Sequence, residues 1–288
     1  MKKILVTGGA GFVGSHLCER LAQDKNTQVY SLDNYFTGSE DNHVPNVTYI
    51  KGSSQNIDSL IDFVPDMIYH LGEYSRVEQS FDDIEKVLEF NKSGTYAVLE
   101  FVRKHKCKLL YAGSSTKFGD SGENADASPY AWSKSTNTQL VKNYGKWFGI
   151  DYAITYFYNV YGPREIKNGK YATLIALFNR KMKNGEVLTV VSPGTQLRNF
   201  THINDTVDAL MLIGEHGHGD EYGIGSPEGY SILDVAKMFG GEIELLPERK
   251  GNRMVAQVMD AKTRELGWKP KVHLSEYIDY CRSQNWEV

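Results

Sequence analysis

The sequence has few of the features that mark secreted, disulfide-stabilised or metal-binding proteins. Its three cysteines, Cys18, Cys107 and Cys281, are scattered and lack the spacing of metal ligands. An odd number of isolated cysteines is typical of proteins from a reducing compartment. We therefore expect buried or incidental thiols, no bound metal ion and a cytoplasmic location.

Long hydrophobic runs are also missing. The N-terminal apolar run extends only from Ile4 to Val6 before glycines intervene, which is too short for the core of a signal peptide. No window approaches the length of a membrane span. The net charge of −4 gives no basic surface for nucleic acid, so any phosphate recognition must be local. These absences predict a protein without a membrane or nucleic-acid partner.

Apolar runs that predict strands alternate with helical patterns through the first half of the chain. The predicted strands are 4–6, 29–33, 47–50, 67–71, 108–112 and 152–156, and the predicted helices are 15–25, 84–104 and 129–148. Strands that alternate with helices indicate a parallel sheet covered on both faces. The predicted fold class is α/β, with a Rossmann-type doubly wound parallel sheet.

The pattern changes after Asn159. Loops lengthen, and short helical patterns appear at 171–184 and 232–240. We expect a Rossmann domain over 1–158 and a smaller, mainly substrate-binding lobe over 159–288, with a segment near 187–213 packing back on the first domain. The second lobe is expected at the carboxyl edge of the sheet, where such folds bind ligands.

A glycine-rich loop joins the first predicted strand to the first helix. Gly8, Gly11 and Gly14 are spaced as Gly-x-x-Gly-x-x-Gly. Such a loop needs glycine where the backbone turns, where it approaches a pyrophosphate and where helix meets sheet. The helix N-terminus then offers free N–H groups to the anion. The loop predicts dinucleotide binding, against the alternative of an ordinary tight turn.

An acidic residue ends the second predicted strand. The carboxylate of Asp33 is placed to accept hydrogen bonds from the adenosine ribose, and a 2′-phosphate there would meet like charge. This favours NAD over NADP. The alternative is a surface aspartate that opens the turn Asp33–Asn34.

A serine, a tyrosine and a lysine form a candidate catalytic set. Tyr130 and Lys134 are four residues apart on a predicted helix, so both project from one face. A nearby ammonium and a cationic nicotinamide favour the phenolate, which can take a proton from a substrate hydroxyl. Ser114, just after the fifth strand, is placed to bond the same hydroxyl. The spacing alone arises by chance, and its context makes it informative.

These residues together resemble the extended short-chain dehydrogenase/reductase family, in particular its NAD-dependent sugar-nucleotide epimerases and dehydratases. The likeness covers essentially the whole chain. Its motifs, in family order, are TGGAGFVG, LDNYFTG, HLG, the segment Asn91–Thr95, SPYAWSK, NVYGPR, RNFTHINDTVDAL, YGIGSPEGYSI and LGWKP.

The resemblance implies roles for further residues. Phe12 and Val13 would present backbone N–H groups to the pyrophosphate. Asn34, Leu71 and Asn91 would also belong to the cofactor site, with Asn91 supporting its wall. Three residues match positions that commonly hold the diphosphate of a nucleoside-diphosphate sugar: Asn159, Arg198 and Arg249. The forked guanidinium of an arginine suits phosphate oxygens. Each arginine has the alternative of being a solvated surface charge.

Two departures from the family pattern bear on the reaction. In the dehydratases and decarboxylases, acidic residues follow the catalytic serine or threonine. Here the corresponding residues are Ser115 and Thr116, which we expect to contact the substrate. These cannot act as a carboxylate acid/base pair, which favours oxidation and re-reduction at one carbon. The segment 115–129 is shorter than is typical, so the sugar pocket is expected to be unusual.

Arg76 stands where the family more often has a small residue. An arginine near the sugar can pair with a carboxylate or with extra hydroxyls. The alternative is a salt bridge to Glu73 or Asp82 at the rim.

The sequence therefore predicts an enzyme that epimerises a nucleotide sugar at C4. Tyr130 removes the hydroxyl proton while hydride passes to tightly held NAD, and hydride then returns to the opposite face. The alternatives are a net C4 dehydrogenase or keto-sugar reductase, a 4,6-dehydratase, and a non-catalytic NAD-binding regulator. Apolar residues along the helix 129–148 also predict a homodimer, with core packing as the alternative explanation.

Overall fold

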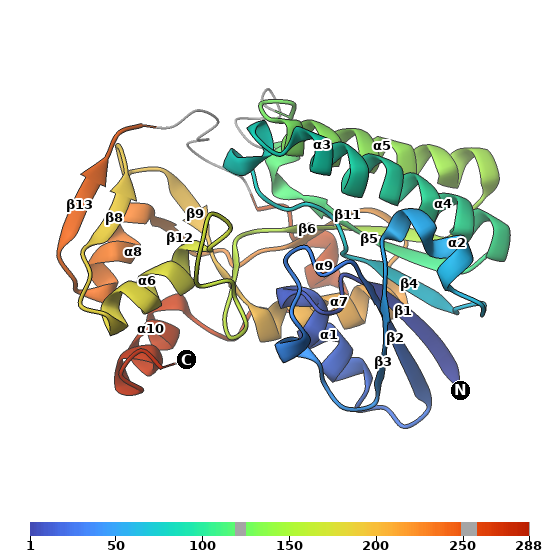
Figure 1. Cartoon of the computed structure of the whole chain (residues 1–288), viewed down its shortest axis with the longest axis horizontal. Helices are drawn as coiled ribbons and strands as arrows, with labels where there is room; N and C mark the ends of the chain where they lie inside the picture. Colours follow the sequence, from blue (N-terminus) through green and yellow to red (C-terminus); the bar gives the residue numbers. More distant parts are fainter. Residues whose placement is uncertain (119–124, 249–257, 288) are drawn as a thin grey trace.

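The computed structural model describes residues 1–118, 125–248 and 258–287. A larger lobe contains the main sheet between two helical layers, and a smaller lobe lies beside one edge of it (Figure 1). The N-terminus lies at the far end of the larger lobe, and the C-terminus lies in the smaller one.

The central sheet has seven parallel strands in the order β11-β6-β5-β4-β1-β2-β3. Their bounds are β1 Lys2–Thr7, β2 Thr27–Asp33, β3 Val47–Lys51, β4 Met67–His70, β5 Lys108–Ser114, β6 Tyr152–Phe157 and β11 Gly219–Ile224. The predicted fold class and the six predicted strands are confirmed, with small differences at their ends. The seventh strand, β11, was not predicted because its sequence, GDEYGI, has glycines and acids in place of an apolar run.

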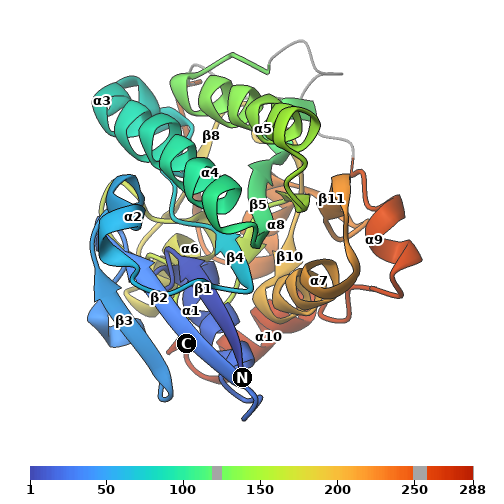
Figure 2. The ribbon, with the colours of Figure 1, turned by 90° about the vertical axis from the view of Figure 1, so that its right-hand side faces the viewer.

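Both faces of the sheet are buried, which explains its continuous apolar strands. In β1, Ile4 and Val6 belong to one core cluster and Leu5 to the other, as the alternation of side chains along a strand requires. Helices α1 Phe12–Leu21 and α7 Ile203–His216 cover the first face. The second face is covered by α2 Ile57–Leu60, α3 Ile84–Val87, α4 Gly94–His105 and α5 Pro129–Phe148 (Figure 2).

The ends of these helices follow from local chemistry. Helix α5 begins where predicted, because the Ser128 hydroxyl accepts a hydrogen bond from the Ala131 N–H at 3.1 Å and Pro129 occupies the first turn. It ends at Gly149, whose φ of +67° suits glycine. Helix α1 begins three residues before the predicted start and ends before Ala22, so the prediction of 15–25 was wrong at both ends. The predicted helix 84–104 contains a wider π-helical turn, η4 Leu88–Ser93, between α3 and α4.

The smaller lobe has its own core. Phe178, Leu188, Phe239 and Ile278 are buried there together. Its elements are α6 Leu174–Lys183, the parallel pair β8 Leu188–Val191 and β13 Ile243–Leu246, the antiparallel pair β9 Leu197–Asn199 and β12 Gly229–Ser231, α8 Ile232–Phe239 and α10 Leu274–Ser283. Helices α6 and α8 lie within a few residues of the predicted ranges.

The second half of the chain contributes to both lobes. A short parallel pair, β7 Val160–Tyr161 and β10 Thr201–His202, leads into α7, which packs on α1. Strand β11 then joins the sheet beside β6, and α9 Ala261–Glu265 packs against β11. Short 3₁₀ turns complete the described chain: η1 Glu40–Asn42, η2 Ser54–Asn56, η3 Glu78–Phe81 and η5 Ser115–Phe118. The expected division at residue 158 stays a prediction.

The three cysteines are free and buried. Burial raises the pKa of the Cys18 thiol to about 12 and that of Cys107 to about 11, so both stay protonated. Within the described ranges, no helix is both long and apolar enough to cross a bilayer.

Candidate active site

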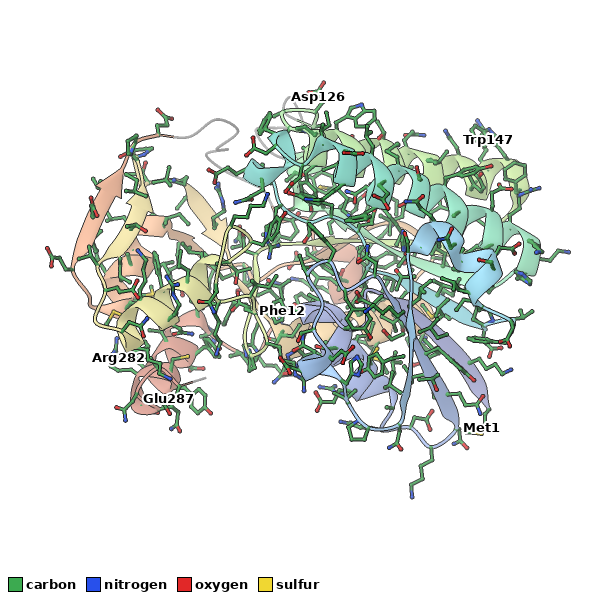
Figure 3. The ribbon with its side chains drawn as sticks, viewed as in Figure 1. Met1, Phe12, Asp126, Trp147, Arg282 and Glu287 are labelled. Carbon is green, nitrogen blue, oxygen red and sulfur yellow. The ribbon has the colours of Figure 1, made fainter. Side chains whose placement is uncertain are left out.

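A cavity of about 990 Å³ lies at the carboxyl ends of the central strands. Its wall includes residues that follow β1, β2, β4 and β5, together with several residues between positions 159 and 200 in the second half of the chain. Phe12, at the start of α1, lies on the side of the larger lobe that faces the smaller lobe (Figure 3). Parallel strands therefore bring residues far apart in sequence to one site.

The glycine loop forms one end of this cavity. Gly8 has a φ of +75°, and a Cβ at this position would lie 2.8 Å from the Cα of Gly72. A Cβ at Gly14 would collide with the carbonyl oxygen of Gly8. Helix α1 starts at Phe12, and Phe12 and Val13 line the cavity. The N–H groups of a first helical turn have no partners in the helix, so this end can hold an anion.

Asp33 has two roles in the structure. Its carboxylate accepts hydrogen bonds from the backbone N–H of Tyr35 at 2.8 Å and of Ala10 at 2.9 Å, and it also lines the cavity. The bond to Tyr35 is the local turn considered above, whereas the bond to Ala10 holds the glycine loop. Burial raises the pKa of Asp33. Asn34 and Leu71 line the cavity beside it.

Ser114 and Tyr130 both line this cavity. Ser114 ends β5 and is 7% exposed, and Tyr130 lies in the first turn of α5 and is 8% exposed. The Ser114 hydroxyl accepts a hydrogen bond from the Thr116 hydroxyl at 3.0 Å. Ser115 and Thr116 also line the cavity. The hydroxyls of these residues are placed to hold a polyhydroxylated ligand.

Lys134 lies one turn after Tyr130, but its ammonium is engaged. It donates hydrogen bonds to the carboxylate of Glu73 and to the carbonyl oxygen of Ala112. Both side chains of the ion pair are buried, at 5% and 2% exposed. Glu73 was considered only as a partner for Arg76. Its position just after β4 was the one signal of a site residue in the sequence.

Asn91 lies behind the wall of the cavity. It is fully buried in η4, where its side-chain oxygen accepts a hydrogen bond from the Tyr74 N–H at 2.6 Å. Its amide group donates to the Tyr74 carbonyl at 3.1 Å and to the Ser133 hydroxyl at 2.8 Å. It therefore fastens the loop after β4 to α5. π-Helical turns often occur at such functional positions.

Arg76 points to the second half of the chain. Its guanidinium donates to the carbonyl oxygen of Tyr171 at 2.9 Å, and to the carbonyl and hydroxyl oxygens of Ser75, both at 3.1 Å. Within the described residues, neither Glu73 nor Asp82 pairs with it, so the alternative of a rim salt bridge was wrong. Burial lowers the pKa of Arg76, and the side chain lines the cavity.

Like Glu73, the carboxyl group of Glu165 lines the cavity and was not predicted as a site residue. Glu165 is 6% exposed and accepts a hydrogen bond from the Gly162 N–H at 2.9 Å. Burial raises its pKa to about 7. It follows the NVYGPR segment directly, and nothing in that pattern distinguishes it from a surface glutamate.

The expected diphosphate residues lie in the part of the wall contributed by the second half. Asn159 donates to the carbonyl oxygen of Asn199 at 2.9 Å, and Arg198 donates to that of Leu197 at 2.8 Å. Both line the cavity. Arg249 lies outside the described residues. Among the residues that are described, no group of three or more His, Cys, Asp or Glu side chains is arranged to hold a metal ion.

Comparison with known sequences links the chain to one family. The model of the NAD dependent epimerase/dehydratase family matches residues 4–225. UDP-glucuronic acid decarboxylase 6 of Arabidopsis thaliana is 31% identical over 306 residues, which cover 95% of this chain and 86% of the relative. A putative UDP-glucose 4-epimerase of Methanocaldococcus jannaschii is 31% identical over 301 residues, which cover 98% and 97%.

Solved structures show the same likeness over the whole fold. UDP-glucose 4-epimerase of Thermotoga maritima, solved with UDP-glucose, superposes with a TM-score of 0.88 at 27% identity, covering 98% of this chain and 99% of that one. UDP-glucose 4-epimerase of Thermus thermophilus, solved with NAD, gives a TM-score of 0.89 at 25% identity, covering 99% of both chains.

Proposed function

The chain belongs to the NAD dependent epimerase/dehydratase family, and from this premise we propose that it is a nucleotide-sugar 4-epimerase. The observation that supports this function is that Ser114 and Tyr130 line one cavity with Ser115 and Thr116, which stand where the dehydratases carry acidic residues. Hydroxyls there can bind a sugar but cannot act as the acid and base of an elimination.

The residues at the glycine loop fit NAD. Gly8 and Gly14 leave no room for a side chain, which lets a pyrophosphate approach the backbone and the start of α1. Asp33 favours a ribose with a free 2′-hydroxyl over one with a phosphate. When bound, the nicotinamide supplies a hydride acceptor and, in its reduced form, a hydride donor.

The proton steps are assigned to the chain's own side chains. The phenolate of Tyr130 takes the proton of the C4 hydroxyl, and the phenol returns it after the sugar has presented its other face. Ser114 donates a hydrogen bond to the same oxygen and stabilises the carbonyl that forms there. Asn159 and Arg198 are proposed to hold the diphosphate, and Arg249 keeps the same expected role.

Glu165 gives a second candidate some support. A carboxyl group with a pKa of about 7 can donate or accept a proton near neutral pH, and this one lines the substrate cavity. A 4,6-dehydratase or a decarboxylase needs chemistry at a second carbon, for which such a group is suited. A net C4 dehydrogenase or keto-sugar reductase remains a further alternative.

Product analysis distinguishes the epimerase from a dehydrogenase and from a dehydratase. The purified protein is incubated separately with UDP-glucose and UDP-galactose plus catalytic NAD⁺, and the sugars are identified by NMR. A 4-epimerase gives the same mixture from either side without accumulating NADH. Stoichiometric NADH would identify a dehydrogenase, and a 4-keto-6-deoxy sugar would identify a dehydratase. Tyr130→Phe is expected to lower kcat by at least 100-fold because it removes the proton acceptor.

We also propose a homodimer in the cytoplasm. Val141 and Tyr144 on α5 are buried, so core packing accounts for them, whereas Tyr96 on α4 and Trp147 on α5 are 55% and 57% exposed. Exposed aromatic side chains in the outer helical layer support pairing with a second copy. The free, buried thiols suit a reducing compartment.

A further inference from the structure

The loop after β4 carries a buried carboxylate that none of the roles above uses. Glu73 lies just beyond the end of β4, and its side chain is 2% exposed. An ionised carboxylate is costly to bury unless it is paired and hydrogen-bonded. Its neighbours therefore show what it is held for.

Side chains from three elements satisfy the two oxygens of Glu73. Its Oε1 accepts hydrogen bonds from the Thr95 hydroxyl on α4 at 2.8 Å, the Asn137 amide on α5 at 3.0 Å and the Tyr111 hydroxyl on β5 at 3.2 Å. Its Oε2 accepts from the ammonium of Lys134. The neutral donors hold Oε1 of the carboxylate in place, and Oε2 forms the ion pair with Lys134.

The ion pair is buried beside the cavity. Glu73 and Tyr130 line the cavity, and Lys134 is not part of that lining. The ammonium of Lys134 also donates a hydrogen bond to the carbonyl oxygen of Ala112 on β5. In this arrangement the cation that favours the phenolate of Tyr130 is compensated by an adjacent anion.

We propose that Glu73 is a positioning residue for Lys134. It holds the lysine ammonium in a buried ion pair beside the cavity and offsets the positive charge at Tyr130. Its effect on the reaction is to place the working range of Tyr130 at higher pH than an unpaired lysine would. This role rests on the proposed function, because it acts through the base of that reaction.

The other described ionisable groups around Glu73 and Lys134 do not supply a negative charge. Burial lowers the pKa of His70 to about 4, so this side chain is neutral at physiological pH, hydrogen-bonded to Thr7 and Thr95. Burial also raises the pKa of the Tyr111 phenol well above its ordinary value. The groups that face Glu73, Lys134 or Tyr130 from the surrounding elements are His70 on β4, Arg76 after β4, Lys92 on η4 and Tyr111 on β5.

The test is the pH dependence of turnover in Glu73→Gln. The amide keeps the size of the side chain and an oxygen for Lys134 but removes the negative charge. We expect the acidic limb of the kcat profile to move to lower pH by on the order of one unit, since a charge at this range shifts an ionisation by that amount. The KM for the nucleotide sugar is expected to stay within about twofold. A limb that stays in place or moves to higher pH would overturn the proposal.

Two control variants separate the charge from the shape. Glu73→Asp keeps the charge and is expected to keep the limb within about 0.3 units of the wild type. Glu100→Gln removes another carboxylate that bonds an arginine and a tyrosine, Arg103 and Tyr144, away from the cavity. A shift in Glu100→Gln equal to that in Glu73→Gln would show a general effect and count against the proposal.

A double variant covers the loss of stability that an unpaired buried cation causes. Glu73→Gln with Lys134→Gln removes both charges and is expected to unfold at a higher temperature than Glu73→Gln alone. Non-additive effects are expected from two groups in contact. If the single and double variants unfold at the same temperature, the two groups are not coupled.

An NMR measurement keeps this proposal separate from the epimerase function. Tyrosine labelled with ¹³C at Cζ reports ionisation without any substrate, and the signal of Tyr130 is assigned by its absence in Tyr130→Phe. We expect this signal to titrate at lower pH in Glu73→Gln than in the wild type. That result without epimerase turnover would refute the function and leave the role of Glu73 standing, whereas turnover with unchanged titration would refute the role of Glu73.

Discussion

At the scale of single residues, burial decides how the cavity carboxyl groups behave. Asp33, Glu73 and Glu165 all line the cavity, yet each is stabilised differently. Asp33 accepts hydrogen bonds from two backbone N–H groups. Glu73 accepts hydrogen bonds from one ammonium group and three neutral donors. Glu165 has a backbone donor, and burial raises its pKa to about 7. The same carboxyl group thus holds a loop at Asp33, pairs with a cation at Glu73 and is able to exchange a proton near neutral pH at Glu165.

The raised pKa of Glu165 predicts a pH dependence of stability. Its folded pKa of about 7 exceeds its ordinary value of 4.5, so the folded state holds a proton that the unfolded state has released. The resulting stabilisation is fully present below about pH 4.5 and is lost as the pH rises through 7. Glu165→Gln should therefore be more stable than the wild type at pH 8, by about 2–3 kcal/mol, with little difference at pH 5.

Urea unfolding at pH 5 and pH 8 measures this difference. Glu244→Gln, on the exposed surface of β13, provides the matched control and is expected to follow the wild type at both pH values. Parallel losses of stability with rising pH in wild type and Glu165→Gln would show that Glu165 is not the group responsible.

At the scale of elements, one aspartate joins the start of α3 to the loop before α6. Asp83 is 7% exposed and accepts hydrogen bonds from the hydroxyls of Tyr171 at 2.6 Å and Tyr74 at 3.0 Å. It also accepts from the ammonium groups of Lys170 at 2.9 Å and Lys86 at 3.0 Å. The Tyr171 hydroxyl and these two ammonium groups hold its pKa well below the ordinary range. The contact fastens a wall of the cavity that the second half contributes.

We predict that Asp83→Asn loosens this wall. The depressed pKa means that the contact is fully present above about pH 4 and is lost as the pH falls further, so the amide should mimic strong acid at neutral pH. Amide exchange of residues 169–173 should accelerate, and KM for the nucleotide sugar should rise several-fold with a smaller change in kcat.

Hydrogen exchange and steady-state kinetics check this prediction, with Asp62→Asn as an exposed control. Unchanged exchange over 169–173 would mean that other contacts hold the loop, such as the bond from Arg76 to the Tyr171 carbonyl.

At the scale of the whole molecule, the outer helical layer leaves aromatic residues exposed. Tyr96 on α4 is 55% exposed, and Trp147 and Phe148 at the end of α5 are 57% and 50% exposed. Trp147 lies at the edge of the larger lobe away from the smaller one (Figure 3). A second copy of the chain would cover this layer without closing the cavity, which opens between the lobes.

We therefore predict that Tyr96→Asp weakens a dimer. Light scattering after size exclusion should give twice the chain mass of 32.5 kDa for the wild type and a single chain mass for the variant at low micromolar concentration. Tyr280→Asp, on α10 of the smaller lobe, changes an equally exposed tyrosine at 53% and should remain dimeric. A wild type that elutes as a monomer would contradict the proposed dimer.

The sequence by itself determined the features that depend on residues close together along the chain. The turn at Gly8, the start of α5 at Ser128 and the cavity position of Asp33 follow from backbone sterics, capping and strand ends within a few residues. Tyr130 and Lys134 share a helix face because four residues make about one turn. The order of these motifs was enough to predict the fold class and the family.

Only the tertiary structure decided which side chains face each other across the cavity. Glu73 and Lys134 are 61 positions apart, and Asp83 and Tyr171 are 88 apart. Parallel strands bring such residues together through long crossovers, so no spacing in the sequence records the contact. The same holds for β11. This segment has no apolar strand pattern and forms a strand because it pairs with β6. Long-range packing thus places the charge of Glu73 near Tyr130, whereas the position of Tyr130 on its helix follows from the local sequence.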